Sequence, residues 1–164
     1  MPAETQFGYA NAAAHPLAEL LACPPGVANL LNASAESIQC EPGKAVFRQG
    51  DRARGLYVVI SGCLLRKAER FTAPLTLGMM QTGALAELAA VLGDGHHTYT
   101  LVAQSPSSLL MLQTDALERA FRAYPPLRMQ LLQEQAREVS RAYFACTTAR
   151  RKGFRRSGGR LSLG

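Results

Sequence analysis

Short apolar runs follow one another between Ile38 and about Leu112, and glycine, proline or charged residues separate them. Such runs are typical of β-strands, and many short strands at close spacing indicate a roll or sandwich. The pattern predicts strands over residues 38–40, 45–48, 56–61, 63–68, 75–80, 99–103 and 109–112. One insert, residues 84–92, is rich in Ala and Leu, which predicts a helix.

Apolar residues recur at helical spacing on both sides of this region. Before it, Pro24-Pro25 separates two predicted short helices. After it, Thr114 or Asp115 can cap a helix that the prolines after Tyr124 stop. The first two helices are predicted over residues 16–23 and 26–31, and a longer one over residues 127–148. The predicted fold class is therefore mainly β with flanking helices.

The longest predicted helix carries a narrow apolar stripe whose members are three or four residues apart, as in the seam of a coiled coil. The seam consists of Met129, Leu132, Ala136, Val139, Tyr143 and Cys146. Two interpretations are open, because such a stripe can pack against the body of its own chain or against a second copy.

Charge is distributed unevenly along the 164 residues. Six of the 18 Lys and Arg residues lie after Ala149, and the remaining 12 balance the 12 acidic residues, so the net charge of +6 belongs to the C-terminal segment. A basic, Gly- and Ser-containing end predicts weak, salt-dependent attraction to nucleic acid, or a solubilising tail. Residues 1–15 have no apolar periodicity and are expected to form a flexible arm.

The cysteines Cys23, Cys40, Cys63 and Cys146 are widely spaced and contain no C-x-x-C pair, so free thiols in a reducing cytoplasm are expected. No signal peptide and no bilayer-spanning apolar run is evident. No metal site is predicted, because His96 and His97 are adjacent and would point to opposite sides of a strand. A polar turn is the expected setting for this pair.

Two segments carry a resemblance. The sequence Val46-Phe47-Arg48-Gln49-Gly50-Asp51, followed by Leu56-Tyr57-Val58-Val59-Ile60-Ser61-Gly62, reads as strand, turn, strand, turn. It resembles the start of the cyclic nucleotide-binding β-roll of bacterial Crp/Fnr-type regulators. The resemblance implies a β-roll or jelly roll over residues 16–126, a dimerisation helix over 127–148 and a basic tail over 149–164. Regulators of this family continue into a winged helix-turn-helix domain, for which residues 149–164 are too few, so specific DNA binding is not expected here.

The resemblance also locates a candidate ligand pocket in residues 83–100. In the family, a Glu holds the ribose and an Arg binds the phosphate at the start of a short helix. Glu87 and Thr98 match the family's residues, but His97 replaces the Arg, and a histidine is largely neutral at pH 7 and offers no fork of donors. Ala86 replaces a Gly and Tyr99 a small Ala. The candidate residues of this degenerate phosphate and ribose pocket are Glu87, Leu88, His97 and Thr98.

In the family, the position that reaches the purine of the partner's ligand carries Thr-Ser. Here the matching residues are Ala142-Tyr143, which lack these small hydroxyl side chains. We therefore expect a non-enzymatic, cytoplasmic sensor domain that forms a homodimer and binds no cyclic AMP tightly. The alternative is a functional cyclic nucleotide-binding regulator that uses Glu87, His97 and Thr98, with affinity that falls above neutral pH. No cofactor is assigned, and the candidate effectors are a cyclic nucleotide or another small molecule. A cupin-like enzyme would need more inward histidines than His96 and His97.

Overall fold

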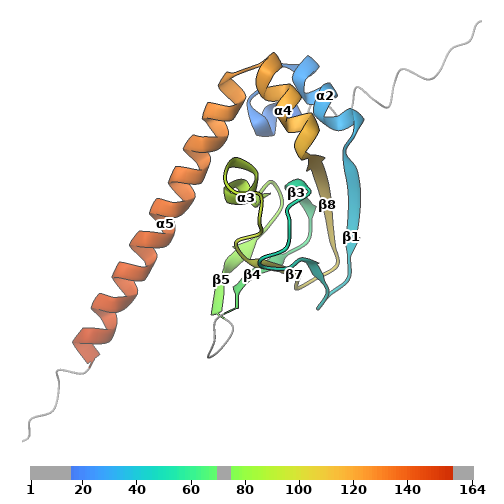
Figure 1. Cartoon of the computed structure of the whole chain (residues 1–164). Helices are drawn as coiled ribbons and strands as arrows, with labels where there is room; N and C mark the ends of the chain where they lie inside the picture. Colours follow the sequence, from blue (N-terminus) through green and yellow to red (C-terminus); the bar gives the residue numbers. More distant parts are fainter. Residues whose placement is uncertain (1–15, 70–74, 157–164) are drawn as a thin grey trace, which may run out of the picture.

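The computed structural model describes residues 16–69 and 75–156, with side chains described as far as Phe144. Two four-stranded antiparallel sheets form a roll, and helices cover one end of it (Figure 1). One sheet has the strand order β1-β8-β3-β6 and the other β2-β7-β4-β5. The strands are β1 (Glu36–Cys40), β2 (Ala45–Phe47), β3 (Gly55–Ser61), β4 (Leu64–Ala68), β5 (Leu75–Met80), β6 (Leu85–Ala86), β7 (Thr100–Ala103) and β8 (Ser107–Gln113).

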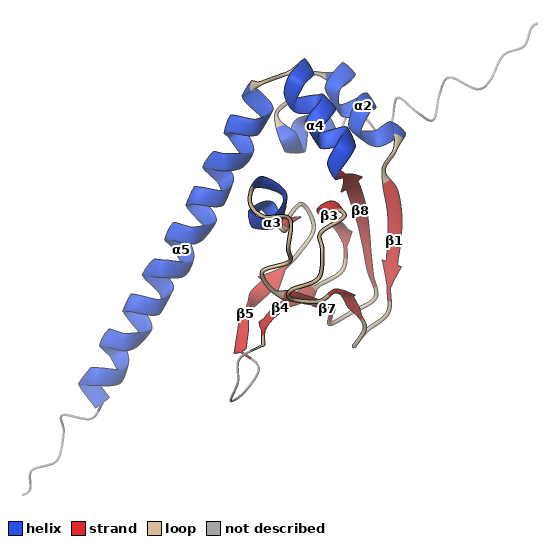
Figure 2. Cartoon of the chain, viewed as in Figure 1, coloured by secondary structure: helices blue, strands red, loops and turns tan. Residues whose placement is uncertain are grey.

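Helices flank this roll, and Figure 2 shows them in blue. Residues 16–21 are helical and lead into α2 (Pro25–Ala33), whose Pro at the first turn suits a helix start. The short helix α3 (Leu88–Leu92) follows β6, and α4 (Thr114–Ala123) follows β8. The last described element is α5 (Pro126–Arg156), which starts beside α4 and extends past the roll (Figure 1). The predicted β-roll followed by a long helix is confirmed.

Strand β3 is buried on both faces, and this explains its continuous apolar run. Leu56 and Val58 face a cluster formed with α2, α4 and the start of α5, whereas Tyr57 and Val59 face a second cluster between the two sheets. Successive side chains of a strand point to opposite faces, so a strand shared by two cores needs apolar residues at every position. Leu127 and Leu131 anchor α5 to the first cluster.

The turns that flank β3 explain the glycines of the Val46–Gly62 motif. Gly50 and Gly62 both have positive φ, at 87° and 92°, which favours glycine. A Cβ at Gly50 would meet nothing within 4 Å, but one at Gly62 would lie 2.3 Å from Oγ of Ser107. The motif therefore ends in glycine for two reasons, backbone conformation and the closeness of β8.

Several predicted boundaries were wrong. The predicted helix over residues 84–92 is instead β6, a left-handed Glu87 and the short α3, because residues 85–86 pair with Tyr57 and Val58 of β3. Cys63 lies just before β4, Tyr99 just before β7, and β8 begins at Ser107, two residues before the predicted strand. No side chain caps α4, whose N-cap is Gln113.

The predicted long helix exists, and α5 continues beyond Thr148 to Arg156. The predicted arm, residues 1–15, lies outside the described residues, as do residues 157–164 of the predicted tail.

Candidate functional site

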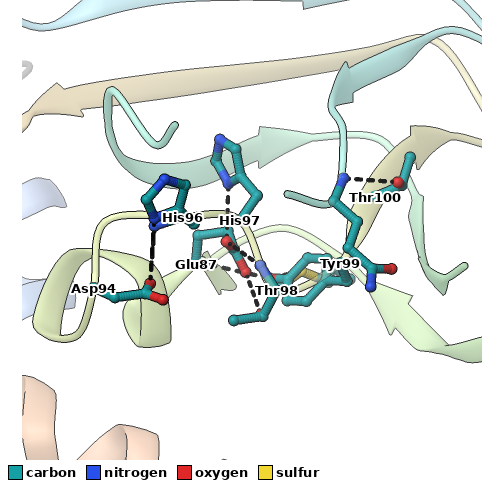
Figure 3. Close-up of polar contacts among 9 residues, drawn as sticks. Glu87, Asp94, His96, His97, Thr98, Tyr99 and Thr100 are labelled. Carbon is teal, nitrogen blue, oxygen red and sulfur yellow. Dashed lines mark hydrogen bonds and ion pairs between the residues drawn. The ribbon is translucent and has the colours of Figure 1, made fainter. Parts of the chain in front are cut away.

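The candidate site is assembled where β6 meets α3. Glu87 adopts a left-handed conformation with φ of 74°, which is uncommon for a residue with a side chain. This conformation ends β6 and lets α3 begin at Leu88. The Glu87 side chain is fully buried beneath the segment that carries His97, Thr98 and Tyr99 (Figure 3). A buried carboxylate needs hydrogen-bond partners, because burial without them is costly.

Both carboxylate oxygens of Glu87 have such partners within the chain. The Thr98 hydroxyl donates to Oε1 at 2.8 Å, and the Thr98 backbone N–H donates to Oε2 at 3.0 Å. Nδ1 of His97 lies 2.8 Å from the same Oε2. The structure thus brings together three of the four candidate pocket residues, because both His97 and Thr98 contact the Glu87 carboxylate (Figure 3).

His97 is held by stacking on its ring, by the contact of its Nδ1 with Glu87, and through its backbone. Its imidazole stacks on the ring of Phe47, with centroids 3.8 Å apart and planes 4° from parallel. Its backbone N–H donates to the carbonyl of Asp51, and its carbonyl accepts from Gly50 N–H. The Val46–Gly62 motif therefore contributes directly to the candidate site, through Phe47 and through the Gly50-Asp51 turn.

The two adjacent histidines lie in different environments. The His97 side chain is 2% exposed and His96 is 58% exposed, so they point to opposite sides as predicted. The expected polar turn holds for His96, whose backbone N–H donates to Asp94. For His97 that expectation was wrong, because its ring lies in the core between Phe47 and Glu87.

Tyr99 completes the enclosure of Glu87. Its hydroxyl accepts a hydrogen bond from the Glu87 backbone N–H at 3.0 Å. Burial, and then the charge of Glu87, raise the pKa of the Tyr99 phenol above its ordinary value, so the phenol stays neutral. The guanidinium of Arg66 lies over the Tyr99 ring, 5.8 Å from its centroid, and pairs with Glu138 of α5. Contacts therefore run from the buried Glu87 to the long helix.

A cleft of about 910 Å³ lies between α5 and the roll. Leu88 and Ala142 line it, but Glu87, His97, Thr98 and Tyr99 do not. The cleft therefore includes one of the four candidate pocket residues, and the Glu87 network lies outside its lining. The residue that sequence reasoning missed is Arg66, which lines the cleft and faces Tyr99 and Glu138. A single arginine in a strand gives no sequence signal for such a role.

The described seam residues of α5 lie mostly on its exposed side. Met129, Val139 and Tyr143 are more than half exposed, and Ala136 is also exposed. Leu132 is half-buried, and the Cys146 side chain lies outside the described residues. The roll is contacted by a different face, through Leu127 and Leu131.

Residues 16–69 and 75–144 give little support for a metal site of several ligands or for a reactive buried cysteine. This part of the chain contains no group of three or more His, Cys, Asp or Glu side chains that could hold a metal ion. Cys23, Cys40 and Cys63 are free, and burial raises the pKa of the Cys23 and Cys40 thiols, which disfavours reactive thiolates. No helix in the described ranges is long and apolar enough to cross a membrane.

These features define a β-roll of the cyclic nucleotide-binding type. Residues 37–124 match the sequence family described as "Cyclic nucleotide-binding domain". The chain therefore belongs to the cyclic nucleotide-binding domain family. None of the curated proteins matches the chain.

Solved structures agree with this assignment. The sensor domain of the transcriptional regulator DNR from Pseudomonas aeruginosa is 26% identical, with a TM-score of 0.67, over 79% of this chain and 87% of that one. The catabolite activator protein of Thermus thermophilus is similar in fold, with 24% identity and a TM-score of 0.67, over 77% of this chain and 60% of that protein. Another crystal structure of DNR from Pseudomonas aeruginosa gives 24% identity and a TM-score of 0.63, over 89% of this chain and 65% of that chain.

Proposed function

We propose that this chain is a non-enzymatic, cytoplasmic sensor domain of a Crp/Fnr-type regulator in which the nucleotide pocket no longer takes a cyclic nucleotide. The observation that carries this proposal is the closed network around Glu87. Its two carboxylate oxygens are engaged by Thr98 and His97, and its side chain has no exposed surface. A ribose hydroxyl would have to displace these partners before it could reach the carboxylate.

The cost of breaking these buried contacts disfavours nucleotide binding. A ligand that takes over the Glu87 carboxylate would leave the donors that now bind it without a partner. Each buried polar group left unpaired costs about 1–3 kcal/mol. The His97 ring offers no compensating charge-assisted fork for a phosphate, because it is stacked on Phe47 and directed at Glu87. Together these costs would weaken binding by roughly a hundredfold or more.

The second part of the proposal is that α5 joins two copies of the chain. The predicted seam is apolar, and its described members Met129, Val139 and Tyr143 are exposed although they are large. The face of α5 that contacts the roll lies on the opposite side of the helix, so a second α5 could cover the seam without displacing the roll.

Isothermal titration calorimetry with cyclic AMP and cyclic GMP tests the proposed loss of nucleotide binding. We expect no binding heat at micromolar ligand, at either pH 6 or pH 8. The competing hypothesis, in which a protonated His97 replaces the family's Arg, predicts binding at pH 6 that weakens at pH 8. Micromolar binding at either pH would contradict the proposal.

A further inference from the structure

Two sulfur atoms meet on the outer face of the sheet that contains β4 and β5. Leu64 of β4 pairs with Met80 of β5, and both side chains are buried between the two sheets. Successive side chains of a strand point to opposite faces, so the residues before them, Cys63 and Met79, belong to the outer face. There Sγ of Cys63 lies 3.7 Å from Sδ of Met79.

The side chain of Gln104, which follows β7, lies beside the same thiol. Its Oε1 is 3.4 Å from Sγ of Cys63. The thiol hydrogen therefore has two acceptors, this oxygen and the Met79 sulfur. A cation that took the place of the hydrogen would meet both of them. Met79 also borders the cleft beside α5, whereas Cys63 and Gln104 do not.

The backbone of Cys63 is held firmly, so its thiol is presented from a fixed position. The Cys63 N–H donates to Oγ of Ser105 at 3.0 Å. Its carbonyl accepts from the N–H groups of Gln104 and Ser105 and from the Ser107 hydroxyl. Cys63 is half-buried and the Met79 side chain is 57% exposed, so an ion from solvent can reach both sulfurs. Donors that are already in place lose little freedom when they bind.

The buried cysteines offer a less suitable setting. Burial raises the pKa of the Cys23 and Cys40 thiols, which opposes the loss of the proton that a metal ion must replace. Sγ of Cys40 is also directed at the backbone carbonyls of Glu41 and Lys44, at 3.8 and 3.4 Å. Cys63 is the described cysteine that combines access from solvent with a neighbouring sulfur.

We propose that Cys63 and Met79 form a binding site for a soft monovalent cation, Cu(I). Thiolate and thioether sulfurs are the donors that Cu(I) prefers. Two metal–sulfur bonds of about 2.3 Å each can span up to about 4.6 Å, so one ion can bridge this pair of sulfurs. On binding, the Sγ–H bond of Cys63 breaks, its proton passes to solvent and an Sγ–Cu bond forms, while copper stays Cu(I).

A site with two sulfur donors suits an ion of low coordination number. Structural zinc sites and iron–sulfur clusters take four protein ligands, and residues 16–69 and 75–144 contain no group of even three His, Cys, Asp or Glu side chains placed to hold a metal. The inference is independent of the proposed function, because Cys63 and Met79 do not contact the Glu87 carboxylate.

Competition with bicinchoninate, which forms a coloured Cu(I) complex, tests the inference on the reduced chain without oxygen. All proteins carry Cys146→Ser, which removes the thiol whose side chain lies outside the described residues. We expect the chain to take one Cu(I) from bicinchoninate and Cys63→Ser to abolish this binding. Met79→Leu should weaken it about tenfold or more, since even partners outside the ligand sphere contribute that much.

Met129→Leu is the matched control, because Met129 has the same exposed fraction of 57% but lies on α5. It should leave the affinity unchanged. X-ray absorption of the copper-loaded chain provides a second readout, with two sulfur neighbours expected in the parent protein and one in the Met79→Leu variant. The inference is overturned if the chain takes no Cu(I) from bicinchoninate, if Cys63→Ser or Met79→Leu leaves the affinity unchanged, or if the parent protein shows a single sulfur neighbour.

Discussion

Glu87 shows how one residue can keep its family identity and acquire a different set of contacts. It matches the family's ribose-binding Glu in sequence, but here it accepts hydrogen bonds from Thr98 and contacts His97. Tyr99 adds a hydrogen bond to its backbone. Each of these neighbours is internal to the chain, and we propose that the carboxylate serves the fold and not a ligand.

Replacing Glu87 tests this structural role. Glu87→Ala should lower the free energy of unfolding by about 3 kcal/mol, because it leaves the Thr98 N–H and the His97 ring without a buried partner. Thr98→Ala removes only the hydroxyl bond and should cost about 1 kcal/mol. Urea denaturation followed by circular dichroism measures both values, and a loss below 1 kcal/mol for Glu87→Ala would contradict the role.

The β2–β3 and β3–β4 connections show why the Val46–Gly62 motif was readable from sequence. Both connections contain a glycine with positive φ, and only the second is crowded. Gly55, at the start of β3, is similarly confined, because a Cβ there would lie 2.0 Å from the Leu112 carbonyl oxygen. These glycines fix the turn geometry and the packing of β3 against β8.

A pair of glycine substitutions separates the two constraints. Gly50→Ala should cost about 1 kcal/mol, because only the backbone conformation is unfavourable. Gly62→Ala should cost at least about 2 kcal/mol more, because the added methyl group must also displace Ser107 of β8. Thermal and urea unfolding provide the comparison, and equal losses in the two variants would contradict the crowding argument.

The sequence predicted most strands because apolar runs and turn glycines follow local rules. It did not predict β6, since Ala and Leu favour a helix and only pairing with β3 makes residues 85–86 extended. The resemblance pointed to Glu87, His97 and Thr98, but not to their closure, which depends on the stacking of His97 on Phe47. Arg66 and Glu138 meet only through the placement of α5, which no local pattern specifies.

On the scale of the whole molecule, one face of α5 packs against the roll and another face carries the predicted seam. Leu127 and Leu131 hold the helix to the roll, and the predicted seam lies on the other side. The Arg66–Glu138 ion pair adds a contact further along the helix.

Charge introduced on the seam should separate the dimer. Val139→Glu places two carboxylates opposite each other in a parallel pair of helices, and it should weaken association by roughly a hundredfold. Arg137→Gln changes the net charge by the same amount on an exposed position away from the seam, and it should have little effect. Sedimentation velocity measures both, and a dimer equally stable in the Val139→Glu variant would contradict this role of α5.

The most direct test of the central claim is a nuclear magnetic resonance titration of the isotope-labelled chain with cyclic AMP. The backbone amides of Glu87 and Thr98 report on the pocket, because the first donates to Tyr99 and the second to Glu87. A closed pocket predicts that both amide signals keep their chemical shifts at millimolar cyclic AMP. Saturable shifts of these two amides at micromolar cyclic AMP would contradict it.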